Sequence, residues 1–378
     1  MAEDDRSIKK AIVTIKVFGV GGGGNSVLLR MAKSDFLNIE LVAVNTDAKQ
    51  LGAMEAAGVK ILPIGETLTR GRGTGGKVEL GEEAAKADEA KIKQMMAGAD
   101  LIFITAGMGG GAGTGATPVV ARIAKELNIL TIGVVTIPFS FEGKRKRRLA
   151  EEGITKLQSQ MDALIAVQND NLMKLPENHS MSLADAFSAA DEILRQAIRS
   201  VAELILTTGV VNVDFADVTT IFRQSDSSDA LLGIGRSNKS AVAAVQQAVA
   251  SPLIDKSLKG ARGIILNITG DDSLTLYDVN EATQYIFKNA DPDVNIIFGV
   301  VSDPHMKENI QATIIATDFA DSMALKAPKV EVPQSTVTMS QGFSLDTPEF
   351  MNKGSSAPGG GAFALPAFKL TQDAEDKQ

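Results

Sequence analysis

The feature that most constrains this 378-residue chain is a glycine-rich stretch in its first third. The apolar run Leu101 to Ile104 predicts a buried strand, residues 107–115 contain six glycines, and the apolar periodicity of residues 119–127 predicts a helix. A loop between a strand end and a helix start presents unpaired N–H groups, and glycine lets the backbone approach an anion closely. The stretch therefore predicts a phosphate-binding loop, with a tight helix-packing turn as the alternative.

The same residues, GMGGGAGTG at 107–115, resemble the signature loop of the tubulin/FtsZ family in its bacterial cell-division form, which has Thr where this chain has Ala112. No Walker pattern occurs in the chain, so backbone amides rather than a P-loop lysine are expected to hold phosphates. The resemblance implies GTP and GDP as ligands, with Mg²⁺ held mainly by the GTP phosphates. The nucleotide contacts that it implies here are Gly107, Gly109, Gly110, Gly111, Ala112, Gly113, Thr114 and Gly115.

A second glycine-rich turn, residues 19–25, follows a predicted strand at 11–18 and precedes a helix predicted from about Ser26 to Ala32. Its GxGxxG spacing, with an acid after the next strand at 40–44, leaves a nicotinamide-dependent oxidoreductase of the Rossmann type as an alternative. The second long glycine loop argues against that alternative, because a dinucleotide fold uses one such fingerprint. By the resemblance, both loops face one nucleotide. The contacts implied are Gly21, Gly22, Gly23, Gly24, Asn25, Ser26, Asn45 and Asp47.

A third glycine cluster, residues 70–77, is too polar for a strand and predicts a surface loop. The equivalent family loop lies beside the terminal phosphate, which implies contacts from Gly73 and Thr74. The family sequence there is Gly-Ala-Gly-Ala-Asn-Pro, and Lys77 offers a charge that the family pattern lacks. An ordinary flexible loop is the alternative.

The predicted strand at 130–136 is followed by Glu142 and by a basic run at 144–148. A carboxylate at this strand end is placed to accept hydrogen bonds from ribose hydroxyls, and the resemblance gives Glu142 that role. The family has Arg where this chain has Lys146, the implied sugar-phosphate contact. A solvated charged face is the alternative for the basic run.

Two further elements predict recognition of the base. Asn169 follows the predicted strand at 163–167, and its amide can both donate and accept, although a turn or helix-capping role is equally open. Residues 182–207 carry the longest helical apolar stripe and predict a spine between two domains. Asp191 falls near that stripe, where guanine N–H groups could satisfy its carboxylate and Phe187 could lie against the base. A helix salt bridge is the alternative for Asp191.

Asp214 and Asp217 lie three residues apart after this helix, on one face of the next predicted helix. On physical grounds alone, a helix-capping box is the stronger explanation. The run NVDFADV at 212–218, however, matches the synergy loop of FtsZ proteins. The resemblance assigns catalysis to Asp214, Asp217 and Asn212, inserted into the nucleotide site of the next subunit of a head-to-tail homopolymer.

The sequence thus predicts an α/β fold: a parallel-sheet Rossmann-like GTPase domain, a long central helix, a smaller α/β domain with a mixed sheet, and a disordered C-terminal tail. Strands are expected at 263–268, 296–301 and 312–316, with helices at 239–250 and 278–289. The expected boundaries are a disordered extension at 1–10, the GTP-binding domain at 11–181, the central helix at 182–208, the C-terminal domain at 209–322 and the tail at 323–378.

Composition bounds the partners. The net charge of −8 and pI near 5.1 argue against nucleic acid, and the absence of cysteine and of a long apolar run predicts a cytoplasmic protein without direct membrane insertion. Residues 345–351 and 365–370 resemble the tail by which FtsZ proteins bind membrane-anchoring division proteins, with plain disorder as the alternative. The resemblance implies a GTPase of the mid-cell division ring. A nucleotide-binding filament with little catalysis is a further alternative.

Overall fold

The computed structural model describes most of the chain between residues 13 and 319. The described ranges are 13–33, 39–174, 180–207, 211, 213–225, 227–254, 258–271, 274–303, 306 and 309–319. Asn212, the predicted extension at 1–10 and both tail segments, 345–351 and 365–370, lie outside these ranges.

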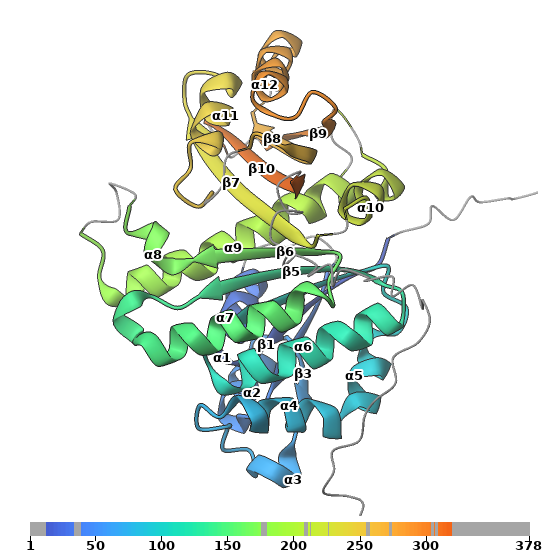
Figure 1. Ribbon diagram of the computed structural model, residues 1–378, viewed down its shortest axis with the longest axis vertical. Coiled ribbons are helices and arrows are strands. Elements are labelled where there is room, and N and C mark those ends of the chain that lie inside the picture. Colours follow the sequence, from blue (N-terminus) through green and yellow to red (C-terminus); the bar gives the residue numbers. More distant parts are fainter. Residues whose placement is uncertain are drawn as a thin grey trace, which may run out of the picture. The chain divides into compact units, whose positions relative to one another are not determined.

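The described strands form one sheet of order β3-β2-β1-β4-β5-β6-β7-β10-β8-β9 (Figure 1). Neighbours from β3 to β7 are parallel, β10 is antiparallel to both β7 and β8, and β9 is parallel to β8. The predicted α/β class, with a mostly parallel sheet that becomes mixed near the C-terminus, is confirmed. The strands are β1 Ile15–Val20, β2 Glu40–Asn45, β3 Lys60–Pro63, β4 Leu101–Gly107, β5 Leu130–Ile137, β6 Ala163–Gln168, β7 Asp229–Ser237, β8 Ala261–Gly270, β9 Asn295–Ser302 and β10 Ile310–Phe319.

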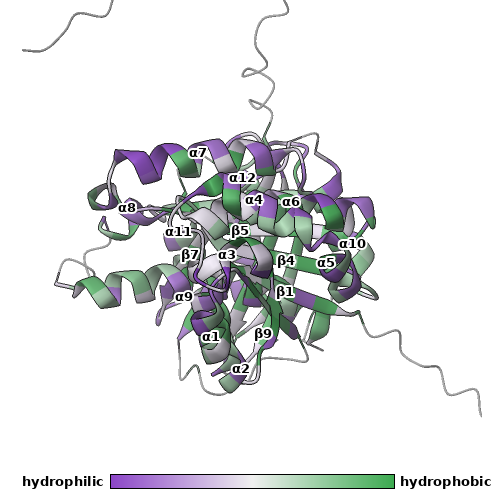
Figure 2. Cartoon of the chain, turned by 90° about the horizontal axis from the view of Figure 1, so that it is seen from below, coloured by the Kyte–Doolittle hydropathy of each residue, from purple (hydrophilic) through white to green (hydrophobic). Residues whose placement is uncertain are grey.

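Helices cover both faces of the sheet. Side chains of α1, α9 and α10 share one core with one face, those of α4 to α7 share a second core with the other face, and α11 and α12 enclose a third core over β8 and β10. In Figure 2, α7 is coloured mostly hydrophilic, whereas β1 and β4 are mostly hydrophobic. The helices are α1 Gly21–Ala32, α2 Ala48–Ala56, α3 Glu66–Thr69, α4 Val78–Ala87, α5 Glu89–Met96, α6 Gly111–Glu126, the 3₁₀ turn η1 Ser140–Glu142, α7 Lys144–Gln158, α8 Asn169–Leu172, α9 Leu183–Leu206, α10 Phe215–Arg223, α11 Ala241–Val249 and α12 Leu276–Asn289.

The predicted spine is α9, a helix of 24 residues that spans about 36 Å at 1.5 Å per residue. It begins where the Ser182 hydroxyl accepts a hydrogen bond from the Asp185 amide, and its buried stripe includes Leu194, Ile198 and Val201. In Figure 1, α8 lies near its first end and α10 beyond its last. Within the described ranges, neither α9 nor another helix combines the length and apolarity needed to cross a bilayer.

Two details differ from the sequence prediction. The turns predicted at 19–25 and 107–115 are shorter, because α1 already begins at Gly21 and α6 at Gly111, so several of their glycines form first helical turns. The strands β3 and β7 were not predicted. Strand β7 contains Gly233 and Gly235, at which any Cβ would collide with backbone carbonyls of α11, so two of its positions carry no apolar side chain.

Helix packing against the glycine loop predicts that two glycine substitutions change the free energy of unfolding in opposite directions. In Gly115→Val, the side chain would collide with the Val78 carbonyl of α4, so we expect the free energy of unfolding to fall by about 3 kcal/mol. Gly52→Ala on α2 meets no neighbour within 4 Å and should raise stability by about 0.5–1 kcal/mol. Urea denaturation of both variants tests this, and a Gly115→Val protein as stable as wild type would contradict the packing.

Candidate functional site

The predicted site residues gather along one edge of the sheet. Because β2, β1, β4, β5 and β6 are adjacent and parallel, their carboxyl ends lie side by side. The chain leaves β1 toward β2 on one side, and β4 lies on the other, so the switch in strand order falls between β1 and β4. In open α/β sheets, ligands bind at this point.

Two helix N-termini meet at the switch point. Helix α1 starts directly after β1, α6 starts after the short turn that follows β4, and neither start has a side-chain cap. The loops touch through their backbones, since a Cβ on Gly21 would lie 2.6 Å from the Gly113 nitrogen. Two uncapped N-termini bring donor groups and the positive ends of two helix dipoles together. This arrangement fits a polyphosphate.

The loop geometry leaves room in front of α6. A Cβ on Gly110, the N-cap of α6, would meet no atom within 4 Å. A Cβ on Gly111 would collide with the Thr74 hydroxyl, so the loop at 70–77 packs against the first turn of α6. On the other side, the Lys146 carbonyl would lie 2.7 Å from a Cβ on Gly109, which brings the start of α7 to the same loop.

Side-chain amides connect the first glycine loop to the end of β2. The Asn25 amide nitrogen donates hydrogen bonds to the carbonyls of Gly19 and Gly21, each at 2.9 Å. Its amide oxygen accepts a hydrogen bond from Asn45 Nδ2 at 3.2 Å. Asn45 Nδ2 also donates to Gln50 Oε1 at 3.0 Å. Asn25 and Asn45 are buried, so this network fixes the first glycine loop.

Three predicted ligands also have partners within the chain. Asp47 caps α2, because its Oδ1 accepts hydrogen bonds from the backbone amides of Lys49 and Gln50 at 2.9 and 3.2 Å. Glu142 accepts a hydrogen bond from the Phe139 amide at 3.0 Å and pairs with Lys146 at 3.1 Å. Asp47, Glu142 and Lys146 thus lie at the edge where they were predicted. Their contacts with a ribose stay a prediction.

At the end of β6, Asn169 is 4% exposed and its Oδ1 has no hydrogen-bond partner. The turn and capping explanations for Asn169 therefore receive no support, and a buried unpaired oxygen fits an incoming N–H group. Its neighbour Asp170 accepts hydrogen bonds from the amide and hydroxyl of Ser140 and pairs with Arg147 at 3.3 Å. Burial opposes ionisation of Asp170, but the Ser140 hydrogen bonds and the Arg147 charge outweigh it and lower the pKa.

The first half of α9 contributes an aromatic ring and a carboxylate. Phe187 is 40% exposed and packs edge-on against Phe139 at 5.5 Å and Phe141 at 6.3 Å, measured between ring centroids. Asp191 Oδ2 pairs with Arg30 Nε at 3.3 Å, so its salt bridge joins α9 to α1 rather than lying within one helix. Burial raises the pKa of Asp191, and the hydrogen bond and charge of Arg30 oppose that rise.

The predicted catalytic acids lie elsewhere. Asp214 and Asp217 are exposed at the start of α10, and the Asp214 side chain makes no capping hydrogen bond, so the capping-box explanation is not supported. Between Phe187 and Leu206, α9 alone spans about 28 Å. The structure therefore does not bring these acids to the strand-end site of their own chain.

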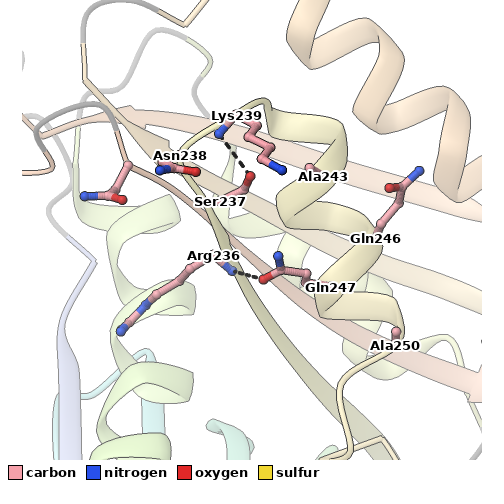
Figure 3. A pocket seen from close by; sticks show the side chains of 9 residues that line it. Arg236, Ser237, Asn238, Lys239, Ala243, Gln246, Gln247 and Ala250 are labelled. Carbon is pink, nitrogen blue, oxygen red and sulfur yellow. Dashed lines mark hydrogen bonds between the residues drawn. The ribbon is translucent and has the colours of Figure 1, made fainter. Parts of the chain in front are cut away.

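A separate hollow of about 540 Å³ lies at the end of β7 and along α11 (Figure 3). There Gln247 Oε1 accepts a hydrogen bond from the Arg236 amide at 3.3 Å, and Ser237 Oγ accepts one from the Lys239 amide at 3.1 Å. None of the predicted nucleotide-binding residues lines this hollow, so it is not part of the strand-end site.

Sequence reasoning missed several residues at the site: Arg30, Gln50, Ser140 and Asp170. Asp170 had one signal, because it follows Asn169 directly at a strand end. Arg30 had none, because its partner Asp191 is 161 residues away and no local spacing relates them.

The fold and the strand-end loops together define a nucleotide-binding α/β protein. A sequence model of the Tubulin/FtsZ family, GTPase domain, matches residues 14–177, and one of the FtsZ family, C-terminal domain, matches residues 228–320. The chain belongs to the tubulin/FtsZ family and is a GTPase that binds GTP and GDP. These matches favour a GTPase over the alternative of a nicotinamide-dependent oxidoreductase.

Solved structures agree with this assignment. An empty FtsZ dimer from M. jannaschii is 38% identical, with a TM-score of 0.77 over 84% of this chain and 92% of that one. A mutant of FtsZ from M. jannaschii is also 38% identical, with a TM-score of 0.78 over 82% of this chain and 93% of that one. CetZ2 from Haloferax volcanii, solved as a GTPγS-bound protofilament, shares the fold at 22% identity. Its TM-score is 0.67 over 82% of this chain and 96% of that one.

The open space at Gly110 generates a binding prediction. Gly110 has an extended backbone that any residue can adopt, so Gly110→Val should keep wild-type stability but fill the space in front of α6. We expect GTP affinity to fall at least about 30-fold, equivalent to about 2 kcal/mol. Titration with a fluorescent GTP analogue measures this. Unchanged GTP affinity in the folded variant would show that no phosphate binds in front of Gly110.

Proposed function

We propose that this GTPase assembles head to tail into filaments and that each active site is completed by the neighbouring subunit. The observation that carries the proposal is the separation along α9. Asp191 lies in its first half and Asp214 follows its end, with about 28 Å of helix between Phe187 and Leu206. One chain cannot bring both regions to one nucleotide, but two chains arranged head to tail can.

Within one subunit, the triphosphate lies at the N-termini of α1 and α6, where backbone N–H groups and helix dipoles stabilise its charge. Glu142 and Lys146 bind the sugar side. Guanine lies against Phe187, with Asn169 and Asp191 at its polar edge. The unpartnered Asn169 Oδ1 supports this placement, because a base N–H would satisfy it.

The second subunit supplies the acids. Asp214 and Asp217 are exposed and the Asp214 carboxylate is not used as a helix cap, so both are available to a neighbour. There they hold and polarise the attacking water, because phosphoryl transfer needs positioning and charge stabilisation more than covalent chemistry. Asn212, which lies outside the described residues, is proposed to act with them.

A head-to-tail contact of this kind joins two different surfaces and does not close, so repetition gives a filament. The dimeric state of the M. jannaschii FtsZ structure, at 38% identity, supports self-association. A site that forms only on assembly makes hydrolysis depend on polymerisation.

Mg²⁺ neutralises phosphate charge when it is bound. Following the family resemblance, we assign the ion mainly to the GTP phosphates. Among the described residues, no group of three or more acidic or histidine side chains is arranged to hold a metal ion. We further propose that the filaments build a cytoplasmic division ring at mid-cell. Membrane-anchoring partners would bind the tail at 345–351 or 365–370; this part of the proposal rests on sequence resemblance.

The proposal predicts that hydrolysis requires assembly and the acid pair. Phosphate release per molecule should rise steeply with protein concentration, and Asp217→Ala should lower it at least about 100-fold while GTP affinity stays within about twofold of wild type. Glu55→Ala removes an exposed acid at the far end of α2 and serves as the matched control with wild-type turnover.

Sedimentation and phosphate release should be followed together, in GTP and in a slowly hydrolysed analogue. Turnover per molecule that is independent of concentration would contradict the shared site. Filaments that form without hydrolysis in the wild type would favour the alternative of a nucleotide-binding polymer with little catalysis.

A further inference from the structure

One ion pair links the two helices that the proposed function assigns to opposite ends of the nucleotide. Arg30 lies on α1. The first turns of α1 and α6 form the proposed phosphate-binding edge, and Asp191 lies on α9, at the proposed guanine position. Arg30 Nε donates to Asp191 Oδ2 at 3.3 Å, with side-chain exposures of 37% and 20%. Arg30 is not among the nucleotide contacts that the sequence predicts.

We propose that Arg30 is a positioning and specificity residue for guanine, which it secures by keeping the Asp191 carboxylate ionised and fixed in orientation. The inference rests on the proposed role of Asp191 and adds the residue on which that role depends. Arg30 itself need not touch the nucleotide.

The geometry leaves Asp191 able to bind the base. An ionised carboxylate has about four lone-pair positions on its two oxygens, and Arg30 uses one of them, on Oδ2. The remaining positions can accept from guanine N1–H and N2–H together. The hydrogen bond from Arg30 also restricts rotation of the carboxylate, so less orientational freedom is lost when the base binds.

The charge state decides which base is accepted. Burial raises the pKa of Asp191, and Arg30 opposes this by hydrogen bonding and charge. The other charges on α9 and on the elements packed against it are engaged. Arg195 pairs with Glu192 on α9, Asp170 on α8 pairs with Arg147, and Arg262 on β8 pairs with Asp291. Strands β5 and β9, which also pack on α9, carry no charged residue. Adenine presents an acceptor where guanine presents N1–H, so only the ionised form of Asp191 rejects adenine.

The sign of the pH dependence follows. Guanine binding requires ionised Asp191 and is lost as pH falls through the pKa of this carboxyl. Because Arg30 lowers the raised pKa of Asp191, removing Arg30 raises that pKa further, and guanine binding is then lost at a higher pH.

The test compares GDP, IDP and ADP binding to the full chain from neutral to mildly acidic pH. IDP lacks the N2 amino group, so the GDP-to-IDP ratio reports the Asp191 contact. For Arg30→Met we expect GDP affinity about tenfold lower at neutral pH, a smaller GDP preference, and a steeper loss toward acid. Arg30→Lys should restore the pH profile in large part, because it keeps the charge. Lys33→Met, which removes an exposed cation at the end of α1, is the matched control.

Asp191→Asn separates this inference from the proposed function. If Asp191→Asn leaves the GDP-to-IDP ratio unchanged, the proposed guanine contact itself fails. If Asp191→Asn abolishes the preference but Arg30→Met matches wild type in both ratio and pH profile, only the role of Arg30 is overturned. If the inference is correct, the double variant Arg30→Met with Asp191→Asn has the same nucleotide preference as Asp191→Asn alone. Circular dichroism of each variant establishes that it is folded.

Discussion

The length and rigidity of α9 are the constraint on which the rest of this structure depends. Its 24 residues keep Phe187 and Asp191 at one end of a continuous helix and the exposed acids of α10 beyond the other. The interior of the helix is buried in the main core, so it cannot bend to shorten that distance without losing packing. In our account, this is the reason that a complete active site requires a second copy of the chain.

The proposed phosphate-binding edge depends on contact between backbones. Gly21 lies against Gly113, and the loop carrying Thr74 lies against Gly111, so side chains would push the two helix starts apart. In our proposal the donors come from the main chain, so the site needs no P-loop lysine. In our proposal, base recognition is different, since it depends on side chains: Asn169 is buried, Asp191 is partly exposed, and Arg30 sets the charge state and orientation of Asp191.

The sequence predicted most of the architecture because its signals were local. Apolar runs located β1, β2, β4, β5 and β6 but not the four-residue strand β3, and the periodic stripe at 182–207 located α9 within one residue at each end. The β7 strand was missed because Gly233 and Gly235 accommodate α11 and carry no side chain. For Asp214 and Asp217, local rules favoured a capping box that the structure does not form, and the ion pair of Arg30 with Asp191 depends on contacts that only the fold creates.

Complementation between two inactive variants tests the shared active site most directly. Asp217→Ala keeps the phosphate-binding edge and lacks the acid, whereas Gly110→Val keeps the acids and blocks that edge. At a GTP concentration that saturates wild type but not Gly110→Val, each should be inactive alone. An equal mixture should recover up to about a quarter of wild-type GTP turnover, because one in four random head-to-tail contacts joins an intact edge to intact acids. A mixture as inactive as its components, although sedimentation shows that the two variants copolymerise, would contradict the account.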